Sequence, residues 1–581
     1  MPRFHELPKH ILFISLGVLL LFSPFAVDHR MMYPTQFGQL FFFFSMAIIA
    51  AGCLLLQPSG IRHIRVVDSL LLLICIYVTA GALIGYRGIP PQSYWLLPAL
   101  MILYAAFRNS VADLAPYFLG IILLTGTLEA IYGNLQLYNV LPSYSSIYKL
   151  TGTFFNPAPF AGYLIMSFPI GVGVLLYRHE LPKWLRIIAV INVLTIFVVL
   201  PASASRAALF AALVPIISLI LAVPYIKQRL PYIGNIVIGI CIAGCLMFSY
   251  FMKKHSADGR VLIWKAGLQM ISDKPLTGWG FDKFKANYMD YQGKYLGSAT
   301  PAEKKLADNV QYAYNEFIHI AVEGGVIGLL LLATLLLFLF RTRSKNGETS
   351  IYLTLSRAGV MSLVVFSMFS YPAEIFPILI VSTCYVAIIA GQTTSLFSLT
   401  IRRWQLLFAP ALVYTWMSLQ GEKHGYISWS EANTCYYAGS YEESITLYEA
   451  AYPYMYNNGL FLSHYGKALS QAKMHRQSLQ IIHASLAYNA DAYSYLAMGD
   501  DYKALNKPAL AAESYQRAAG MVPVQLYPRY CLAKLYFETN QQDKGIPIAR
   551  ELLLMSAKVN SKAVRQIKQE MIFFIEKANE K

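Results

Sequence analysis

Apolar residues along this chain fall into long blocks that short polar segments separate. A helix needs about 17–24 such residues to cross the ~30 Å of hydrocarbon in a bilayer. We therefore predict thirteen membrane-spanning helices, at 11–27, 37–56, 66–84, 94–107, 114–132, 159–177, 185–200, 207–223, 233–251, 317–340, 356–370, 375–391 and 404–420. The segment 94–107 is short and contains Pro98, so a re-entrant segment is the alternative there. No small-residue cleavage site follows the first block, which we interpret as a retained span.

The pattern changes at residue 421, where single apolar positions recur with a period close to 34 residues. That period is typical of tetratricopeptide repeats, in which successive helix pairs stack into a solenoid. A small residue is expected at the first position of the column, and positions four and seven residues later should contact the neighbouring helix. The three columns are Ser444, Ser478, Ala511 and Gly545; Tyr448, Ile482, Tyr515 and Ala549; and Ala451, Ser485, Ala518 and Leu552.

The fold class that follows is all-α, a polytopic membrane helix bundle with about 12–13 spans followed by a soluble tetratricopeptide-like solenoid. We expect a membrane domain over 1–420, with a large loop at 252–316, and a repeat domain over 421–581. Residues 560–578 are expected to form a terminal capping helix. The concave surface of such a solenoid suits a peptide or protein, although a passive stabilising role is the alternative. We also expect the membrane domain to fold without the tail.

Composition agrees with a membrane protein, because 56% of residues are hydrophobic and only 13% are charged. The net charge of +16 could indicate nucleic acid, but the basic residues are concentrated in alternate loops. With the N-terminus inside, fifteen Lys and Arg residues lie in predicted cytoplasmic loops and four (Arg30, Arg87, Lys149 and Arg206) in short outward ones. We therefore expect a bacterial inner-membrane protein with no nucleic-acid partner. The loops 133–158 and 252–316 and the tail after 420 then face the periplasm.

Basic residues on the outward side are candidates for binding phosphate. Arg206 lies at the start of a span, where a charge is costly unless it has a purpose or a partner. Arg260 and Lys265 lie on a predicted amphipathic surface helix whose apolar positions are Val261, Trp264, Leu268 and Ile271. Attraction to anionic headgroups of inner-membrane lipids is one interpretation, and a phosphorylated substrate is the other. A lipid phosphate would satisfy both.

A second polar group lies at the start of the span that follows the large loop. Tyr314, Asn315, Glu316 and His319 lie within about two helical turns, and Glu323 lies deeper in the apolar segment. A buried carboxylate there requires either a structural partner or a catalytic role. The seven cysteines form no metal-binding spacing, and we expect neither a metal nor a cofactor; whether Cys435 and Cys531 pair is left open.

Five segments together resemble the superfamily of O-antigen ligases, O-antigen polymerases and bacterial protein O-oligosaccharyltransferases. They are "GTFFNPAPFAGYL" (152–164), "SRAALFAALV" (205–214), "GRVLIWKAGLQMISDKPLTGWGFDKF" (259–284), "YNEFIHIAVEGGVIGLLL" (314–331) and "SMFSYPAEIFPI" (367–378). The last resembles the S-x-x-x-Y-P segment of the protein-glycosylating branch. The resemblance covers about residues 150–380, and the five segments occur in the family's order.

The resemblance implies a lipid-donor (C-type) glycosyltransferase fold and a metal-free reaction with an undecaprenyl-diphosphate-linked glycan. Arg206 and Arg260 match the family's two functional arginines and would bind the diphosphate, with Lys265 beside them. Asn156, Trp264, Asn315, Glu323 and Tyr371 would line the site. The family has histidine where this chain has Tyr314. A tyrosine, with a pKa near ~10, is a poor base at neutral pH. Tyr314 would therefore position the acceptor, or Glu316 or, less favoured, His319 would act as the base.

Three acceptors are compatible with this chemistry: a protein Ser or Thr hydroxyl, the lipid A core, or a growing lipid-linked glycan. The repeat tail and the S-Y-P segment favour a protein. A lipid-glycan transporter or a membrane scaffold is the alternative from another class, although the internal repeats expected of a transporter are not apparent. The glycan, the acceptor and the oligomeric state are left open.

The charge distribution generates a testable topology. A cysteine introduced near Asn540 should react with a labelling reagent that cannot cross the inner membrane, because the tail follows an odd number of spans. Labelling only after the inner membrane has been broken would contradict this topology.

Overall fold

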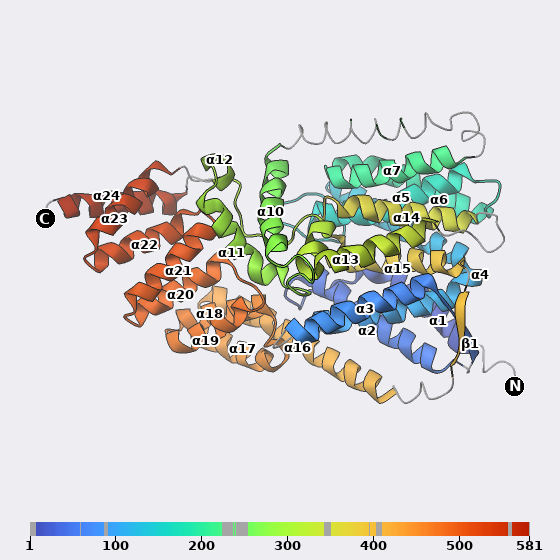
Figure 1. The fold of residues 1–581 in the computed structure, drawn as a ribbon, viewed down its shortest axis with the longest axis horizontal. Helices are drawn as coiled ribbons and strands as arrows, with labels where there is room; N and C mark the ends of the chain where they lie inside the picture. Colours follow the sequence, from blue (N-terminus) through green and yellow to red (C-terminus); the bar gives the residue numbers. More distant parts are fainter. Residues whose placement is uncertain are drawn as a thin grey trace.

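The computed structural model describes residues 7–57, 60–85, 91–223, 254–341, 350–393, 395–401, 409–555 and 561–579, together with positions 236, 239 and 244. Apolar helices run side by side in one half of the molecule and form a bundle (Figure 1). They are α1 (Leu7–Phe22), α2 (Pro34–Leu55), α3 (Val66–Gly85), α4 (Pro91–Leu137), α5 (Pro157–Leu176), α6 (Lys183–Ala202), α7 (Arg206–Ala222), α13 (Glu316–Arg341), α14 (Ile351–Ser367) and α15 (Phe376–Gly391). Short 3-10 turns η2 (Ser23–Phe25) and η3 (Pro372–Glu374) connect some of them.

The bundle accounts for most of the predicted spans. Among the described residues, six helices are long and apolar enough to cross a bilayer and five more are shorter and apolar, and together they match eleven of the thirteen predictions. The predicted span 404–420 is described from Ala409 onward, where it forms the first part of α16 (Ala409–Ala438). The predicted span 233–251 lies outside the described residues. The chain is therefore a multi-pass membrane protein.

α4 contains two of the predicted spans. Its apolar segments are Leu96–Val111 and Leu114–Leu137. The rings of Phe107 and Phe118 pack edge to face with their centroids only 5.4 Å apart. Eleven residues of straight helix would separate them by ~16 Å along the axis, so the chain reverses direction between the two segments. Two antiparallel spans result.

A short two-stranded sheet was not predicted from the sequence. β1 (Gly60–Arg65) pairs antiparallel with β2 (Ser395–Ile401), and Gly60 lies opposite Ile401. The sheet lies at the end of the bundle that is remote from the solenoid (Figure 1). There the Arg65 guanidinium donates to the carbonyl of Ala390 at the end of α15. The sheet thus connects loops that are more than 300 residues apart in sequence.

Three helices follow at the other end of the bundle: α10 (Lys254–Asp273), α11 (Phe284–Gly297) and α12 (Pro301–Lys304). α10 lies across the ends of the spans, as expected of a surface helix (Figure 1). Leu262, Ile263, Ala266 and Met270 are buried on the side where α10 contacts α11 and α13. Of the predicted apolar positions, Trp264 and Ile271 are half-buried and pack against the same core, whereas Val261 and Leu268 are 41% and 58% exposed. The side that packs on protein therefore overlaps the predicted apolar face only in part.

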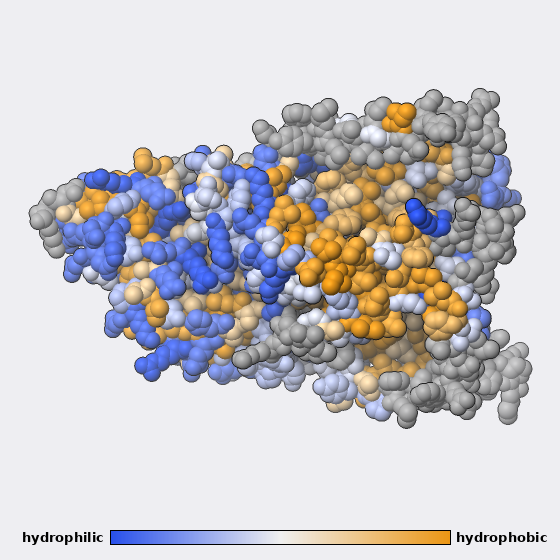
Figure 2. Space-filling view, in the orientation of Figure 1, coloured by the Kyte–Doolittle hydropathy of each residue, from blue (hydrophilic) through white to orange (hydrophobic). Residues whose placement is uncertain are grey.

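The solenoid follows as paired helices: α16 with α17 (Tyr441–Met455), α18 (Gly459–Gln471) with α19 (His475–Leu486), α20 (Ala492–Ala504) with α21 (Pro508–Met521), and α22 (Leu526–Glu538) with α23 (Gln542–Leu554). α24 (Lys562–Asn579) closes the end, close to the predicted capping helix. All twelve residues of the predicted columns are buried, which confirms the repeat. Figure 2 shows the resulting contrast between the hydrophilic solenoid and the hydrophobic bundle.

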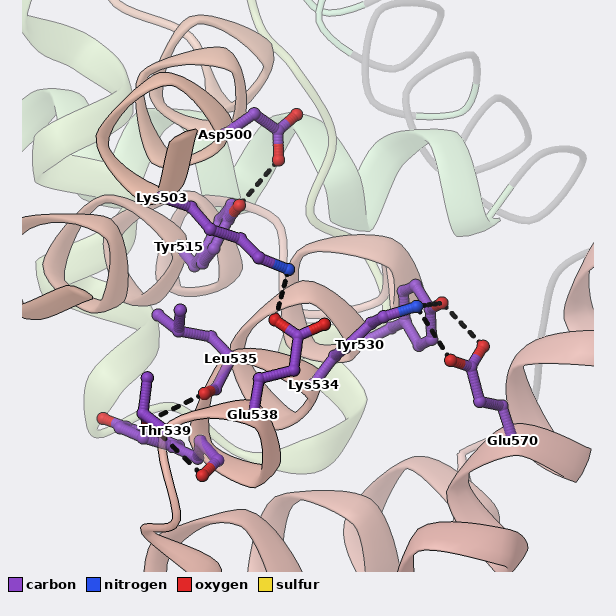
Figure 3. A network of polar contacts seen from close by, with 10 residues as sticks. Asp500, Lys503, Tyr515, Tyr530, Lys534, Leu535, Glu538, Thr539 and Glu570 are labelled. Atoms are coloured by element: carbon purple, nitrogen blue, oxygen red, sulfur yellow. Dashed lines mark hydrogen bonds and ion pairs between the residues drawn. The ribbon is translucent and has the colours of Figure 1, made fainter. Parts of the chain in front are cut away.

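Polar contacts connect neighbouring repeats at their surface (Figure 3). Within one repeat the Tyr515 hydroxyl donates to Asp500 at 2.6 Å. Between repeats, Lys503 of α20 forms an ion pair with Glu538 of α22. Lys534 of α22 lies 2.8 Å from Glu570 of α24. Exposed ion pairs contribute little stability, on the order of 0–1 kcal/mol each. The buried columns therefore carry most of the stability, and the ion pairs select how the last helix packs.

The solenoid and the loop helices share one hydrophobic core. Tyr288 and Met289 of α11 and Met270 of α10 pack in the same cluster as Tyr495 of α20 and Met521 of α21. The buried side chain of Gln292 donates to the carbonyls of Asp308 and Met521, at 2.9 and 2.8 Å. α16 also crosses residue 420 without a break. We therefore withdraw the expectation that the membrane domain folds without the tail, because removing the tail would expose apolar surface on α10 and α11.

A matched pair of substitutions on α21 tests the shared core. Met521→Asp should destabilise the protein by at least about 3 kcal/mol, because Met521 is 1% exposed and the new charge has no partner. Leu510→Asp on the same helix should cost less than about 0.5 kcal/mol, since Leu510 is 40% exposed. Limited proteolysis is the measurement, and Met521→Asp should make the 284–313 segment cleavable together with the solenoid. Cleavage confined to the solenoid would show that the two cores are separate.

Candidate functional site

Three tyrosines gather where the segment before α13 meets the turn between α14 and α15. The rings of Tyr312 and Tyr371 are stacked, with centroids 4.5 Å apart and planes 8° apart. The Tyr314 ring meets Tyr371 edge to face at 5.4 Å. Burial raises the pKa of Tyr314 and raises that of Tyr312 to about 12. All three hydroxyls are therefore protonated at neutral pH and can donate hydrogen bonds.

One arginine, Arg260, lies beside these tyrosines, and a second, Arg206, acts on its charge. Arg206 is the first residue of α7, and Arg260 lies in the first half of α10 with its guanidinium carbon 5.5 Å from the centroid of the Tyr314 ring. Burial lowers the pKa of Arg260, and the positive charge of Arg206 lowers it further. No carboxylate among the described residues contributes to that shift. The two guanidinium groups are therefore near enough to repel each other, and the ring of Tyr314 is the neighbour of Arg260. This arrangement favours binding of an anion.

The turn after α10 fixes Arg260 relative to α13. The Trp279 amide donates to the Val322 carbonyl at 2.8 Å, Gly280 to Glu323 at 2.9 Å, and Val326 to Pro275 at 2.8 Å. α13 departs from helical geometry at Gly325, where φ is 61°. Direct contact between the two backbones requires glycine, since a Cβ on Gly278 or Gly325 would lie 2.4 or 2.2 Å from backbone atoms of the facing segment. These contacts explain the glycines in both motifs.

His319 and Glu323 form a buried pair on the first turns of α13. His319 Nε2 lies 3.2 Å from Glu323 Oε1. That carboxylate also accepts from the Phe284 amide at 3.1 Å, and the Phe284 ring stacks on His319 with centroids 5.1 Å apart. The pair therefore fixes the start of α11 against α13. This geometry favours the structural interpretation of Glu323 over a catalytic one.

Lys285 lies next to the Tyr312 ring and near two carboxylates. Its Nζ is 3.4 Å from Glu374 Oε1, 3.8 Å from Asp282 Oδ1 and 5.4 Å from the centroid of the Tyr312 ring. Burial opposes the charged form of Lys285, but the carboxylates of Glu374 and Asp282 outweigh it and raise its pKa. Burial also raises the pKa of Asp282 to about 6, although Lys285 acts in the opposite direction. The cluster connects α11 to the turn that carries Tyr371.

Strained backbone is concentrated near these groups. Tyr314, Asp282 and Ala204, which lies two residues before Arg206, all have φ between 51° and 59°. Residues other than glycine rarely adopt this conformation, and it costs of order 1–3 kcal/mol each. The surrounding contacts must outweigh that cost. Such strain is common at sites that require a fixed side-chain direction.

Glu316 is the predicted site residue whose carboxylate is best placed to accept a proton. Its Oε1 accepts from the Ala373 amide at 3.0 Å, directly beside the turn that holds Tyr371. Its second carboxylate oxygen makes no hydrogen bond to another described residue. Glu316 therefore lies next to the tyrosine cluster with one oxygen available for a substrate proton.

The remaining predicted residues have mainly structural contacts. The Trp264 indole donates to the Ala313 carbonyl at 3.0 Å and so holds the segment that carries Tyr314. Asn315 caps α13 by accepting from the amides of Phe317 and Ile318, and Asn156 caps α5. Lys265 is not brought to the arginines, because it is exposed and forms a 2.8 Å ion pair with Glu303. Cys435 and Cys531 are both free.

Sequence reasoning did not identify Lys285, Tyr312 or Glu374 as site residues. Glu374 lies three residues after Tyr371 in the S-Y-P segment, and Lys285 comes directly after the turn that contains Gly278 and Gly280. Glu374 lies within the 367–378 segment, and Lys285 directly follows the 259–284 segment. Their contact joins residues 89 positions apart, which no local pattern reveals.

Comparison with known proteins concerns this same region. Residues 191–333 match the O-antigen ligase family. The match runs from α6 into α13 and includes Arg206, Arg260 and Tyr314. It supports a place in the superfamily of O-antigen ligases and polymerases and a glycosyltransferase activity of the ligase or polymerase type.

Two solved structures are similar to a helical part of the chain. They are MamA from Desulfovibrio magneticus RS-1 (residue 41 to the end) and a double mutant of MamA RS-1. Each is 15% identical and covers 29% of this chain and 88% of its own, with TM-scores of 0.22 and 0.23. Similarity this distant says nothing about function. No curated protein sequence matches the chain.

Proposed function

We propose that the protein transfers a glycan from a polyprenyl-diphosphate carrier, of the undecaprenyl type, to an acceptor hydroxyl at the periplasmic face of the bacterial inner membrane. The observation that carries the proposal is Arg260, whose guanidinium carbon lies 5.5 Å from the centroid of the Tyr314 ring, with Arg206 at the start of α7 near enough to act on its charge. The family match over the same residues supports it.

The reaction replaces one bond to the anomeric carbon with another. The acceptor oxygen attacks this carbon while the bond to the diphosphate oxygen breaks, so negative charge grows on the leaving diphosphate. Two guanidinium groups fixed before the reaction begins stabilise that charge without further reorganisation. Each guanidinium can donate two parallel hydrogen bonds to phosphate oxygens, which lysine cannot do. In this proposal the arginines act without a metal.

The acceptor hydroxyl must lose its proton during the attack. Tyr314 is a poor base because burial raises its pKa, so we assign it to positioning. His319 is bonded to Glu323 and covered by Phe284. Glu316 retains a carboxylate oxygen beside the tyrosines, and we propose that it accepts the proton. Lys285, paired with Glu374, contacts the face of the Tyr312 ring, and that ring stacks on Tyr371.

The acceptor we favour is a protein Ser or Thr hydroxyl. The solenoid packs directly on the segment that leads to Tyr314, since the Asn309 side chain accepts from the Ala492 amide and the Gln311 side chain donates to Asn489. A polypeptide bound along the solenoid would therefore be delivered near the arginines. The lipid A core and a growing glycan are the other acceptors to test.

The arginines provide the decisive test. Arg206→Lys and Arg260→Lys should insert and fold normally but lose about 10²–10³-fold in transfer rate, because one preorganised bidentate donor is removed in each. The measurement is the initial rate of transfer from a lipid-diphosphate glycan to peptide, lipid A core or free glycan, with expression and thermal stability as controls. Near-native rates in both variants would exclude the diphosphate site and favour a transporter or a scaffold.

The identity of the base is tested separately. Glu316→Gln keeps the size of the side chain and its acceptor oxygen for Ala373 but removes the basic carboxylate, so kcat should fall by about 10²–10⁴-fold. The acidic limb of the pH–rate profile should disappear with it. Tyr314→Phe should cost much less, because it removes only a positioning hydroxyl. If instead Tyr314→Phe or His319→Asn has the larger effect on kcat, the assignment of Glu316 is wrong.

A further inference from the structure

A polar cavity lies in the loop between α4 and α5, beyond the motifs discussed so far. Its volume is about 590 Å³, and it is lined by Gln136, Asn139, Val140 and the loop residues 141–143 and 145–149. Three serines, Ser143, Ser145 and Ser146, are among the lining residues, together with Lys149. Nothing in the diphosphate site or the proton transfer uses this cavity.

The loop around the cavity is built to keep its shape. The buried side chain of Gln136 donates to the carbonyls of Pro142 and Gly152, both at 3.0 Å. It also accepts from the amides of Thr151 and Gly152, at 3.0 and 2.8 Å. Ser145 Oγ accepts from the amides of Ile147 and Tyr148. Because these hydrogen bonds lie within the loop, the cavity has its shape before any ligand binds. Binding therefore costs little conformational entropy.

Other polar groups in the lining remain available. Asn139, Ser146 and Lys149 form no side-chain hydrogen bond with another described residue, and all three are exposed. Exposed aromatic rings stand beside them, with Tyr144 at 41% and Tyr148 at 43%. Hydroxyl, amide and ammonium groups next to aromatic rings match a carbohydrate, whose hydroxyls donate and accept and whose ring faces are apolar. An acyl chain would instead require a mainly apolar pocket.

The cavity lies at the same end of the bundle as Arg206. The Asn134 side chain, near the end of α4, donates to the Thr195 carbonyl near the end of α6 at 3.1 Å, and α6 ends four residues before Arg206. Tyr148 lines the cavity and acts electrostatically on Tyr314 and Tyr371. Tyr144 also contacts His29 in the segment that leads into α2, with ring centroids 5.8 Å apart. A glycan whose diphosphate lies at the arginines could therefore extend past Tyr148 into the cavity.

We propose that this cavity binds the sugars of the lipid-linked donor that lie beyond the one being joined. The proposal rests on the proposed function and adds a subsite to it. Such a subsite would select donors by the length and composition of their glycan, because contacts remote from the reacting carbon add binding energy only when those sugars are present.

The test compares two donors with the same first sugar. One carries that sugar alone on polyprenyl diphosphate, and the other carries an oligosaccharide. In full-length protein in nanodiscs, Ser146→Trp should fill the cavity and raise KM for the oligosaccharide donor about tenfold, while KM for the single-sugar donor changes less than about twofold. Asn139→Gly should give a smaller change of the same kind; glycine tolerates the φ of 61° at this position, so folding is preserved.

Ser298→Trp is the matched control, since Ser298 is exposed at the end of α11 and does not line the cavity. It should change KM for neither donor. Equal effects of Ser146→Trp on both donors, or no effect on either, would overturn the subsite. A raised KM for a glycan acceptor with an unchanged KM for the donor would also overturn it, because the occupant would then be the acceptor.

A binding measurement separates this proposal from the proposed function. The purified protein is applied to an array of bacterial surface oligosaccharides. Binding that Ser146→Trp reduces about tenfold, and that Ser298→Trp leaves intact, supports the subsite even if no transfer is detected. Transfer that depends on Arg206 and Arg260, without array binding that responds to Ser146→Trp, supports the function and rejects the subsite.

Discussion

The contact between the turn after α10 and the break in α13 is the constraint on which the candidate site depends. Backbone amides of the 275–280 turn and of α13 pair directly, across Gly278 and Gly325. Because backbone meets backbone, no side-chain rotamer can loosen the fit. The contact places Arg260 over Tyr314 and fixes the direction from which α11 departs. Without it, the surface helix that carries one arginine would have no defined position relative to the span that carries Glu316.

Because this backbone contact is rigid, it holds Arg260 where the charge of Arg206 acts on it. Arg260 is half-buried and feels the charge of another arginine, and no carboxylate among the described residues offsets that cost. A folded protein tolerates this electrostatic repulsion when packing elsewhere contributes more stability than the repulsion costs. A bound anion would reduce the repulsion. The strained backbone at Tyr314 and Ala204 adds to the cost. Lys285, in contrast, is fully compensated by Glu374 and Asp282, so its role is to hold the tyrosines rather than to bind phosphate.

The solenoid also helps to hold the candidate site in place. α11 packs against α21 within a shared core, and Gln292 links the two through buried hydrogen bonds. The segment before Tyr314 is bonded to the loop between α19 and α20. Because a shared apolar core unfolds as one unit, the solenoid supports the site as well as offering a surface beside it. A partner that binds the solenoid would therefore act on a structure continuous with the reaction centre.

Sequence alone determined the features that depend on local regularity. The spans follow from the length of apolar blocks, and the solenoid from a period that brings Ser444, Ser478 and Ala511 to equivalent buried positions. The motifs also single out Arg206 and Arg260 as candidates. Tertiary structure decided what depends on contacts distant in sequence. It paired β1 with β2, buried Leu262 and Met270 of α10, held Lys265 at Glu303 and joined Lys285 to Glu374. A periodic pattern reports which residues are buried, but the partner across an interface is set by packing that no single segment contains.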